Sequence, residues 1–122
     1  MATAGATKVK GVDASYYTVK DLGRATKFYN ALLGMEPTVT VGDNIVEYTF
    51  PDGHTFGLYK TEEWTPHGGL LFAVDDVHSA VAEHKARGVK FDGDGHIEDT
   101  PVCHMAFGED SEGNSFIIHK RK

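Results

Sequence analysis

A strand, a helix and three further strands are predicted twice along the sequence, and this internal repeat limits the chain to a few folds. In each half, a short apolar run ends at an aspartate, a helical pattern follows, and a glycine ends that pattern. The two aspartates, Asp21 and Asp76, are 55 residues apart (76 − 21). Because each half alone would leave one face of its sheet uncovered, we expect the two halves to pair.

The first half begins with an apolar strand and an amphipathic helix that is capped at both ends. Asp21 precedes the helix, where its carboxylate can accept hydrogen bonds from free backbone N–H groups. Gly34 follows the helix, at the position where a left-handed glycine commonly ends one. The elements expected in this half are a strand, a helix and three strands, over residues 12–19, 21–33, 38–41, 45–50 and 55–59.

The second half repeats the pattern with a longer connection. Residues 52–58 align with residues 112–118 at an offset of 60 (112 − 52), so about five additional residues fall within 92–101, which is rich in Gly and Asp. The inner face of the second helix is expected to include His84. The elements expected in this half are a strand, a helix and three strands, over residues 70–74, 76–87, 89–91, 102–107 and 115–119.

The predicted fold class is therefore α+β. Two βαβββ modules are expected to form one curved eight-stranded mixed sheet around a cleft, with the helices on the outer face. A chain of 122 residues suits one domain. We expect that domain over residues 11–122, with module one at about 11–62, module two at about 67–120, and a flexible N-terminal tail over 1–10.

The composition narrows the range of partners. The formal net charge of −6 argues against nucleic acid or an anionic membrane, since both select for positive charge. There is no apolar run of about 18 residues and no secretory signal. The single cysteine, Cys103, cannot form an internal disulfide. We expect a cytoplasmic domain.

Three segments match the motifs of a known superfamily. They are Val19-Lys-Asp-Leu with Lys-Phe-Tyr and Leu-Leu-Gly-Met35, Phe72-Ala-Val-Asp-Asp-Val77, and Asp110-Ser-Glu-Gly-Asn114, where Ser111 takes the place of a usual proline. Together they resemble the vicinal oxygen chelate superfamily, also called the glyoxalase/bleomycin resistance/dioxygenase superfamily. The resemblance implies the paired-module fold and a homodimer. It leaves the activity open, because this fold serves isomerases, dioxygenases, epimerases, thiol transferases and drug-binding proteins.

The resemblance also implies where metal ligands would lie. Metal-dependent members place a His or Gln and a Glu from each module around one divalent ion. The four matching positions here are occupied by Ala14, Gly57, Gly69 and Ile117, none of which has a metal-ligating side chain. We therefore expect no metal and no cofactor, and space for a ligand in their place.

Alternation along the strands predicts which side chains face the cleft. Counting from the four metal positions places Tyr16, Thr18, Tyr59 and His119 inside. Two alternatives remain for residues 102–107, with either Cys103, Met105 and Phe107 or His104 and Ala106 inside. Trp64, in the segment that joins the modules, either flanks the pocket or covers the edge of the core.

Glu47 is the main candidate for chemistry. A carboxylate that faces a largely apolar cleft could act as a general base or anchor a ligand amine. Alternatively, Glu47 is a solvated residue near a strand end. His104 or His119 could complete an acid–base pair with Glu47. We expect Cys103 to be buried and inert, and the five remaining histidines to be solvated surface residues: His54, His67, His78, His84 and His96.

Three functions are compatible with these features. The first is a metal-free small-molecule binding protein, sequestering an antibiotic-like or cationic ligand. The second is a lyase or isomerase, using Glu47 and a histidine or a divalent metal held by relocated ligands. The third is a stress-related domain with no catalytic role. The candidate catalytic residues are Glu47 and His104, and the candidate ligand-binding residues are Tyr16, Thr18, Glu47, Tyr59, Trp64, Met105, Phe107 and His119.

Overall fold

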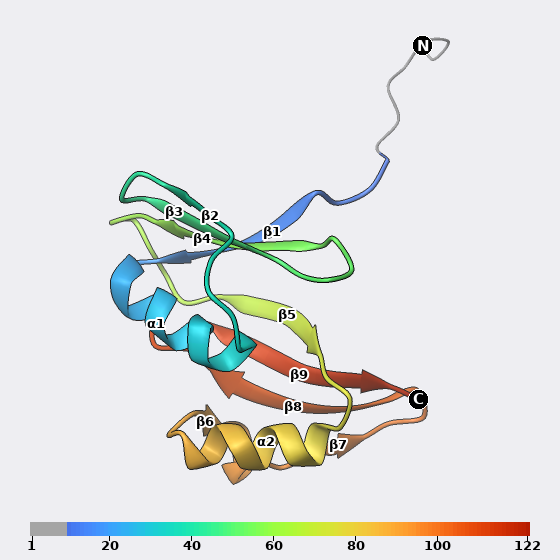
Figure 1. Ribbon diagram of the computed structural model, residues 1–122. Helices are drawn as coiled ribbons and strands as arrows, with labels where there is room; N and C mark the ends of the chain where they lie inside the picture. Colours follow the sequence, from blue (N-terminus) through green and yellow to red (C-terminus); the bar gives the residue numbers. More distant parts are fainter. Residues whose placement is uncertain (1–9) are drawn as a thin grey trace, which may run out of the picture.

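The computed structural model describes residues 10–122 and contains the two expected modules in the expected order (Figure 1). Most of the predicted tail, residues 1–9, lies outside the described residues. Module one consists of β1 (Ala14–Val19), α1 (Leu22–Leu33), β2 (Val39–Val41), β3 (Ile45–Thr49) and β4 (Thr55–Lys60). Module two consists of β5 (Gly68–Ala73), α2 (Val77–Ala86), β6 (Lys90–Phe91), the 3-10 helix η1 (Asp92–Asp94), β7 (Glu98–Asp99), β8 (Cys103–Glu109) and β9 (Ser115–Arg121).

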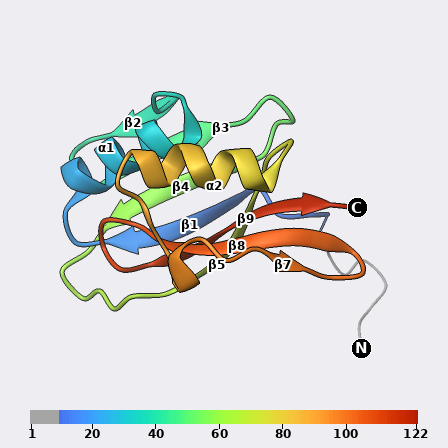
Figure 2. The same ribbon diagram turned by 90° about the horizontal axis from the view of Figure 1, so that it is seen from below.

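Each module contributes its own mixed sheet, and both helices lie on the same side of β1, β8 and β9 (Figure 2). Sheet A has the order β1-β4-β3-β2, and sheet B has the order β5-β9-β8-β6 with β7 also paired to β8. In each sheet only the first pair, β1 with β4 and β5 with β9, is parallel. The predicted α+β class is confirmed. The extra residues at 92–101 form η1 and the short strand β7 rather than a plain loop.

The single eight-stranded sheet that we expected is divided in two at the junction of the modules. Across residues 10–122, no backbone ladder joins β1 to β5. A side chain makes the connection instead, because the Tyr17 hydroxyl donates to the Ser115 carbonyl at 2.6 Å and accepts from the Leu70 N–H at 3.0 Å. The β5 register also shifts between Gly68 and Leu70. This irregularity interrupts the continuous ladder that the repeat predicts.

The helix ends follow the sequence signals. The Asp21 carboxylate accepts from the Arg24 N–H at 2.9 Å, and Gly34 ends α1 with a φ of 70°. In the second module, Asp76 accepts from the His78 N–H at 3.0 Å, and Gly88 follows α2 with a φ of 90°. These contacts satisfy backbone groups that a helix end leaves free. No helix in the described part of the chain has the length and apolar character needed to cross a membrane.

One hydrophobic core lies between the strands and the two helices and crosses the boundary of the modules. Phe56 on β4 is at its centre, with its ring centroid 5.0 Å from that of Tyr29 on α1 and 5.2 Å from that of Phe72 on β5. Phe28 on α1 also packs against Phe116 on β9, at 6.0 Å. Helix α1 therefore buries apolar surface against both sheets, as alternation along the strands predicts.

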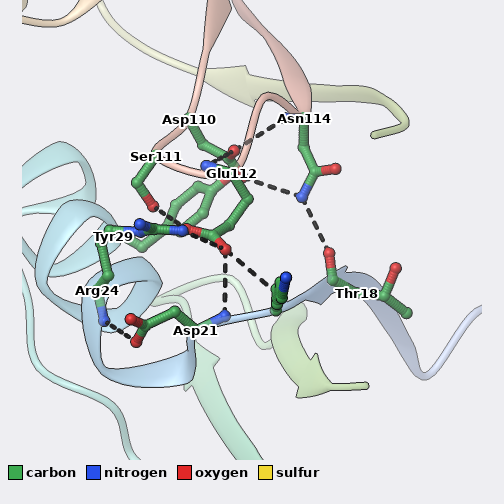
Figure 3. Close-up of polar contacts among 9 residues, drawn as sticks. Thr18, Asp21, Arg24, Tyr29, Asp110, Ser111, Glu112 and Asn114 are labelled. Carbon is green, nitrogen blue, oxygen red and sulfur yellow. Dashed lines mark hydrogen bonds and ion pairs between the residues drawn. The ribbon is translucent and has the colours of Figure 1, made fainter. Parts of the chain in front are cut away.

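The turn before β9 is held against the start of α1 by a buried polar network (Figure 3). The Glu112 carboxylate accepts from Arg24 Nε at 2.7 Å and from the Asp21 N–H at 3.1 Å, and its side chain is fully buried. Asp110 accepts from the Tyr29 hydroxyl at 2.8 Å. Asn114 donates to the Thr18 carbonyl at 3.0 Å. The motif turn is therefore a structural clamp between the two modules.

The clamp predicts that the fold loses stability in acid. Burial acts to raise the pKa of Glu112, but hydrogen bonds from Arg24, the Asp21 N–H and Ser111 outweigh it and hold this pKa below the ordinary value of 4.5. Because the folded-state pKa is the lower one, the stabilisation is complete above the ordinary value and is lost as the pH falls through the lowered pKa. We expect the urea midpoint to fall as the pH drops below about 4.5, through the lowered pKa of Glu112. The fall should be smaller in Glu112→Gln, and an equal fall in both proteins would contradict this assignment.

Candidate functional site

The face of sheet A opposite the helices carries an aromatic–carboxylate pair. The strand register places Tyr16, Gly57, Glu47 and Val39 in one row across β1, β4, β3 and β2. The Tyr16 ring covers Gly57, since a Cβ built at Gly57 would lie 2.6 Å from Tyr16 Cζ. The Tyr16 hydroxyl thereby reaches across β4 and donates to Glu47 Oε2. Glycine at position 57 leaves room for the ring, which any side chain there would displace.

This arrangement leaves an acidic group next to exposed aromatic surface. The hydrogen bond to Glu47, more than burial or charge, raises the pKa of Tyr16 to about 12, so the hydroxyl stays protonated as a donor. Tyr59 is 44 % exposed in the neighbouring row, where it pairs with Thr18 and Ile45. A carboxylate held by one tyrosine, with a second exposed tyrosine in the next row, suits a cation, because both the charge and the ring faces attract positive groups.

The corresponding face of sheet B is mostly apolar. Met105 pairs with His119, and Phe107 pairs with Ile117, so these four side chains share the face opposite the core residues. Of the two alternatives for residues 102–107, the register therefore supports the one that places Cys103, Met105 and Phe107 on this side of the strand. Cys103 alternates in phase with Met105 and Phe107, but it is buried. Its Sγ lies 3.2 Å from Thr100 Oγ1. The expectation of a buried cysteine is confirmed.

His104 lies on the helix-facing side of β8, away from this face. Its Nε2 is 3.4 Å from Asp99 Oδ1, and its ring centroid is 6.0 Å from that of His78 on α2. Glu47 belongs to the other sheet, where its side-chain partner is Tyr16. No contact joins Glu47 to His104 among residues 10–122, and their roles as an acid–base pair stay a prediction. His119 is on the open face, but in sheet B.

The segment between the modules contacts the end of β1. The Thr18 N–H donates to His67 Nε2 at 3.2 Å, and the His67 ring packs 5.2 Å from the Tyr17 ring, measured between centroids. His67 is therefore a structural contact rather than only a solvated residue. Trp64 is partly buried, and its enclosed Nε1 has no hydrogen-bond partner within the described chain.

The residues at the four metal positions of the resemblance do not fit a divalent ion. Ala14, Gly57, Gly69 and Ile117 have no ligand atoms in their side chains, and the Tyr16 ring fills the space beside Gly57. Over residues 10–122, no group of three or more His, Cys, Asp or Glu side chains is arranged to hold a metal.

A cavity of about 660 Å³ lies where the two modules meet, lined by residues of both strand faces, such as Ala14 and Leu71 on the open side and Phe72 on the core side. It is bounded by the end of α1, the start of β1, the turn before β4 and the end of β5. His84 on α2 contributes to its wall, is 7 % exposed, and has a buried Nδ1 with no partner among the described residues. Burial, aided by the charge of Arg87, lowers the pKa of His84. The amphipathic pattern predicts the inward position of His84, whereas its interpretation as a solvated residue is wrong.

Comparisons with known proteins agree with this geometry. The family model described as Glyoxalase/Bleomycin resistance protein/Dioxygenase superfamily matches residues 11–118. The antibiotic binding protein TnmS3 from Streptomyces sp. CB03234 has a similar structure, with 23 % identity, a TM-score of 0.74, and coverage of 96 % of this chain and 100 % of that chain. Lactoylglutathione lyase from Agrobacterium tumefaciens is 16 % identical with a TM-score of 0.76, over 93 % of this chain and 96 % of that chain. No curated protein matches the sequence. At these identities, the structural similarities show the fold alone.

Proposed function

Because the chain belongs to the Glyoxalase/Bleomycin resistance protein/Dioxygenase superfamily, we propose that it binds a small organic cation on the open face of sheet A, without a metal. The observation that carries this proposal is the Tyr16–Glu47 pair, which fixes a carboxylate beside accessible aromatic surface. The absence of ligand atoms at the four superfamily metal positions supports the metal-free form of the proposal.

The charge balance of the site favours a cation as the missing partner. No Lys, Arg or His forms an ion pair with Glu47 among residues 10–122. The Tyr16 hydroxyl orients one carboxylate oxygen and leaves the charge uncompensated. A ligand ammonium or guanidinium would supply that charge and could pack against the Tyr16 and Tyr59 rings. The net charge of −6 would assist the approach of such a ligand.

An antibiotic-like ligand is the more specific form of the proposal. TnmS3 shares the fold and is described as an antibiotic binding protein. Bleomycin, a cationic glycopeptide antibiotic, is therefore the first ligand to test. Uncharged aromatic compounds of similar size serve as the comparison, since they lack the positive group that Glu47 would recognise. Sequestration would require only tight binding, with no chemical change in the ligand.

We expect Glu47→Gln to weaken binding of the cationic ligand by roughly tenfold or more, because a charge-assisted contact is replaced by a neutral one. Isothermal titration calorimetry measures the change. Glu62→Gln is the matched control, since Glu62 is an exposed glutamate in the segment between the modules. If Glu47→Gln binds the cation as tightly as the wild type does, the proposed site is wrong.

A lyase or isomerase that uses Glu47 and a histidine has less support, because the hydrogen-bond partner of Glu47 is Tyr16. The two functions predict different results for Glu47→Gln. Loss of turnover with retained binding would favour catalysis, whereas loss of binding with no wild-type turnover would favour sequestration. Elemental analysis of the purified protein tests the remaining alternative, an enzyme that uses a divalent metal held by relocated ligands. Stoichiometric Zn, Ni, Mn or Fe would overturn the metal-free proposal.

A homodimer and a cytoplasmic location complete the proposal. Exposed apolar side chains on the strands, including Val39, Val41 and Leu71, offer surface that a second copy could cover. Light scattering coupled to size-exclusion chromatography would test this assembly, and a monomeric mass would exclude it. The unpaired Cys103 suits a reducing compartment.

A further inference from the structure

The cavity at the junction of the modules is distinct from the Tyr16–Glu47 pair and has its own binding features. We propose that it is a second ligand site, which takes a small, uncharged ring compound with one hydrogen-bonding group and holds that group at His84. The proposal goes beyond the proposed function, because Tyr16, Glu47 and Tyr59 do not line this cavity. It requires neither Glu47 nor a cation.

The size and lining of the cavity suit an apolar ring. Its volume of about 660 Å³ falls within the usual range for small-molecule sites and far exceeds the voids left by imperfect packing. Much of the wall is made of aliphatic and aromatic side chains from α1, β5 and β9. These side chains offer water few partners, so an organic ring would occupy the space more favourably than water would. The principal apolar residues of the wall are Leu32, Leu33, Phe72, Val74 and Ile118.

His84 supplies the polar point of the cavity. Polar side-chain atoms that are buried usually have a hydrogen-bond partner, and each exception calls for an explanation. The His84 imidazole is more than nine-tenths buried, and its Nδ1 has no partner among the described residues. Rotation of the ring about χ2 exchanges its two edges, so a ligand in the cavity can meet a ring nitrogen. A hydrogen-bonding ligand would supply the contact that the protein leaves open.

The entrance determines the charge that the ligand can carry. Its exposed side chains include Asp13 and Asp52, and Asp52 is paired with His54 at 3.0 Å. The Asp13 carboxylate has no ion-pair partner among residues 10–122 and disfavours anions. The wall beyond the entrance is apolar and disfavours any full charge. An uncharged ligand with a single polar atom satisfies both conditions.

Three bicyclic probes of equal size test the proposal by calorimetry. Indole offers a hydrogen-bond donor, benzofuran offers an acceptor, and indene offers neither. We expect indole or benzofuran to bind the wild-type protein roughly threefold to tenfold more tightly than indene, because one hydrogen bond distinguishes them. His84→Leu should abolish this preference, and His84→Gln, which keeps a polar group, should retain part of it. Circular dichroism verifies that both variants fold.

Two further variants separate this site from the open face. Leu33→Trp adds bulk to the wall and should weaken all three probes. Glu47→Gln should leave all three unchanged, so the second site can succeed or fail independently of the proposed function. The proposal is overturned if no probe binds the wild type, if indene binds as tightly as both polar probes, or if the preference persists in His84→Leu.

Discussion

Replacing Asp110 with alanine is expected to lower the free energy of unfolding by about 4 kcal/mol, a large share of the stability of a small domain. The carboxylate is 7 % exposed and accepts from the Glu112 N–H at 2.7 Å, the Asn114 N–H at 2.9 Å and the Tyr29 hydroxyl at 2.8 Å. Alanine would leave these donors buried without an acceptor. Such unsatisfied groups cost more than the hydrogen bonds contribute on average.

Urea denaturation monitored by circular dichroism measures this loss. Asp43→Ala is the matched control, because Asp43 is an exposed aspartate in the turn between β2 and β3 and its removal should change stability by less than about 0.5 kcal/mol. Asp110→Asn keeps part of the acceptor capacity. Its loss of stability should therefore lie between those of Asp110→Ala and Asp43→Ala. A loss below about 1 kcal/mol in Asp110→Ala would show that the clamp contributes little.

Phe56→Ala is expected to destabilise the fold by roughly 3–5 kcal/mol, as is usual when a buried aromatic ring leaves a cavity. Phe56 is 2 % exposed, and its ring contacts Tyr29 within module one and Phe72 in module two. Because the lost contacts belong to both modules, we propose that residues 11–122 unfold as one domain. The variant should then show one transition at a lower midpoint.

The measurement is thermal unfolding followed by calorimetry, with the calorimetric and van't Hoff enthalpies compared. Tyr59→Ala is the control on the same strand, since Tyr59 points to the open face and its loss should cost much less. Two separate transitions in Phe56→Ala would contradict the single-domain proposal. They would show that the modules fold independently despite the shared aromatic cluster.

The parts of the fold that depend on local chemistry could be predicted from the sequence. Asp21 and Gly34 specify the two ends of α1 through contacts within a few residues, and the repeat specifies the order of the elements. The division between the sheets could not be predicted, because it depends on how Tyr17 meets Leu70 and Ser115 across the modules. Such distant contacts are not encoded in the periodicity of a single strand.

The sequence also predicted part of the candidate site and left part of it open. Alternation places Tyr16 and Glu47 on one face, and the structure agrees, while their roles in binding stay predictions. Residues 102–107 allowed two parities, and only pairing with β9 distinguishes Met105 from His104. One sequence feature indicated the cavity at His84: a polar residue was expected on the inner face of a helix. Its volume depends on packing between modules, which no sequence pattern reports.

The covering of Gly57 by Tyr16 restricts how this protein could change over evolution. Position 57 is where metal-dependent relatives are expected to carry a carboxylate, yet any Cβ there would lie within 3 Å of the Tyr16 ring. A mutation that introduces glutamate at 57 would therefore displace the Tyr16 ring and disturb its hydrogen bond to Glu47. We therefore expect the effects of substitutions at positions 16 and 57 to depend on each other. A metal-ligating side chain at 57 and the present Tyr16–Glu47 hydrogen bond would therefore compete for the same space.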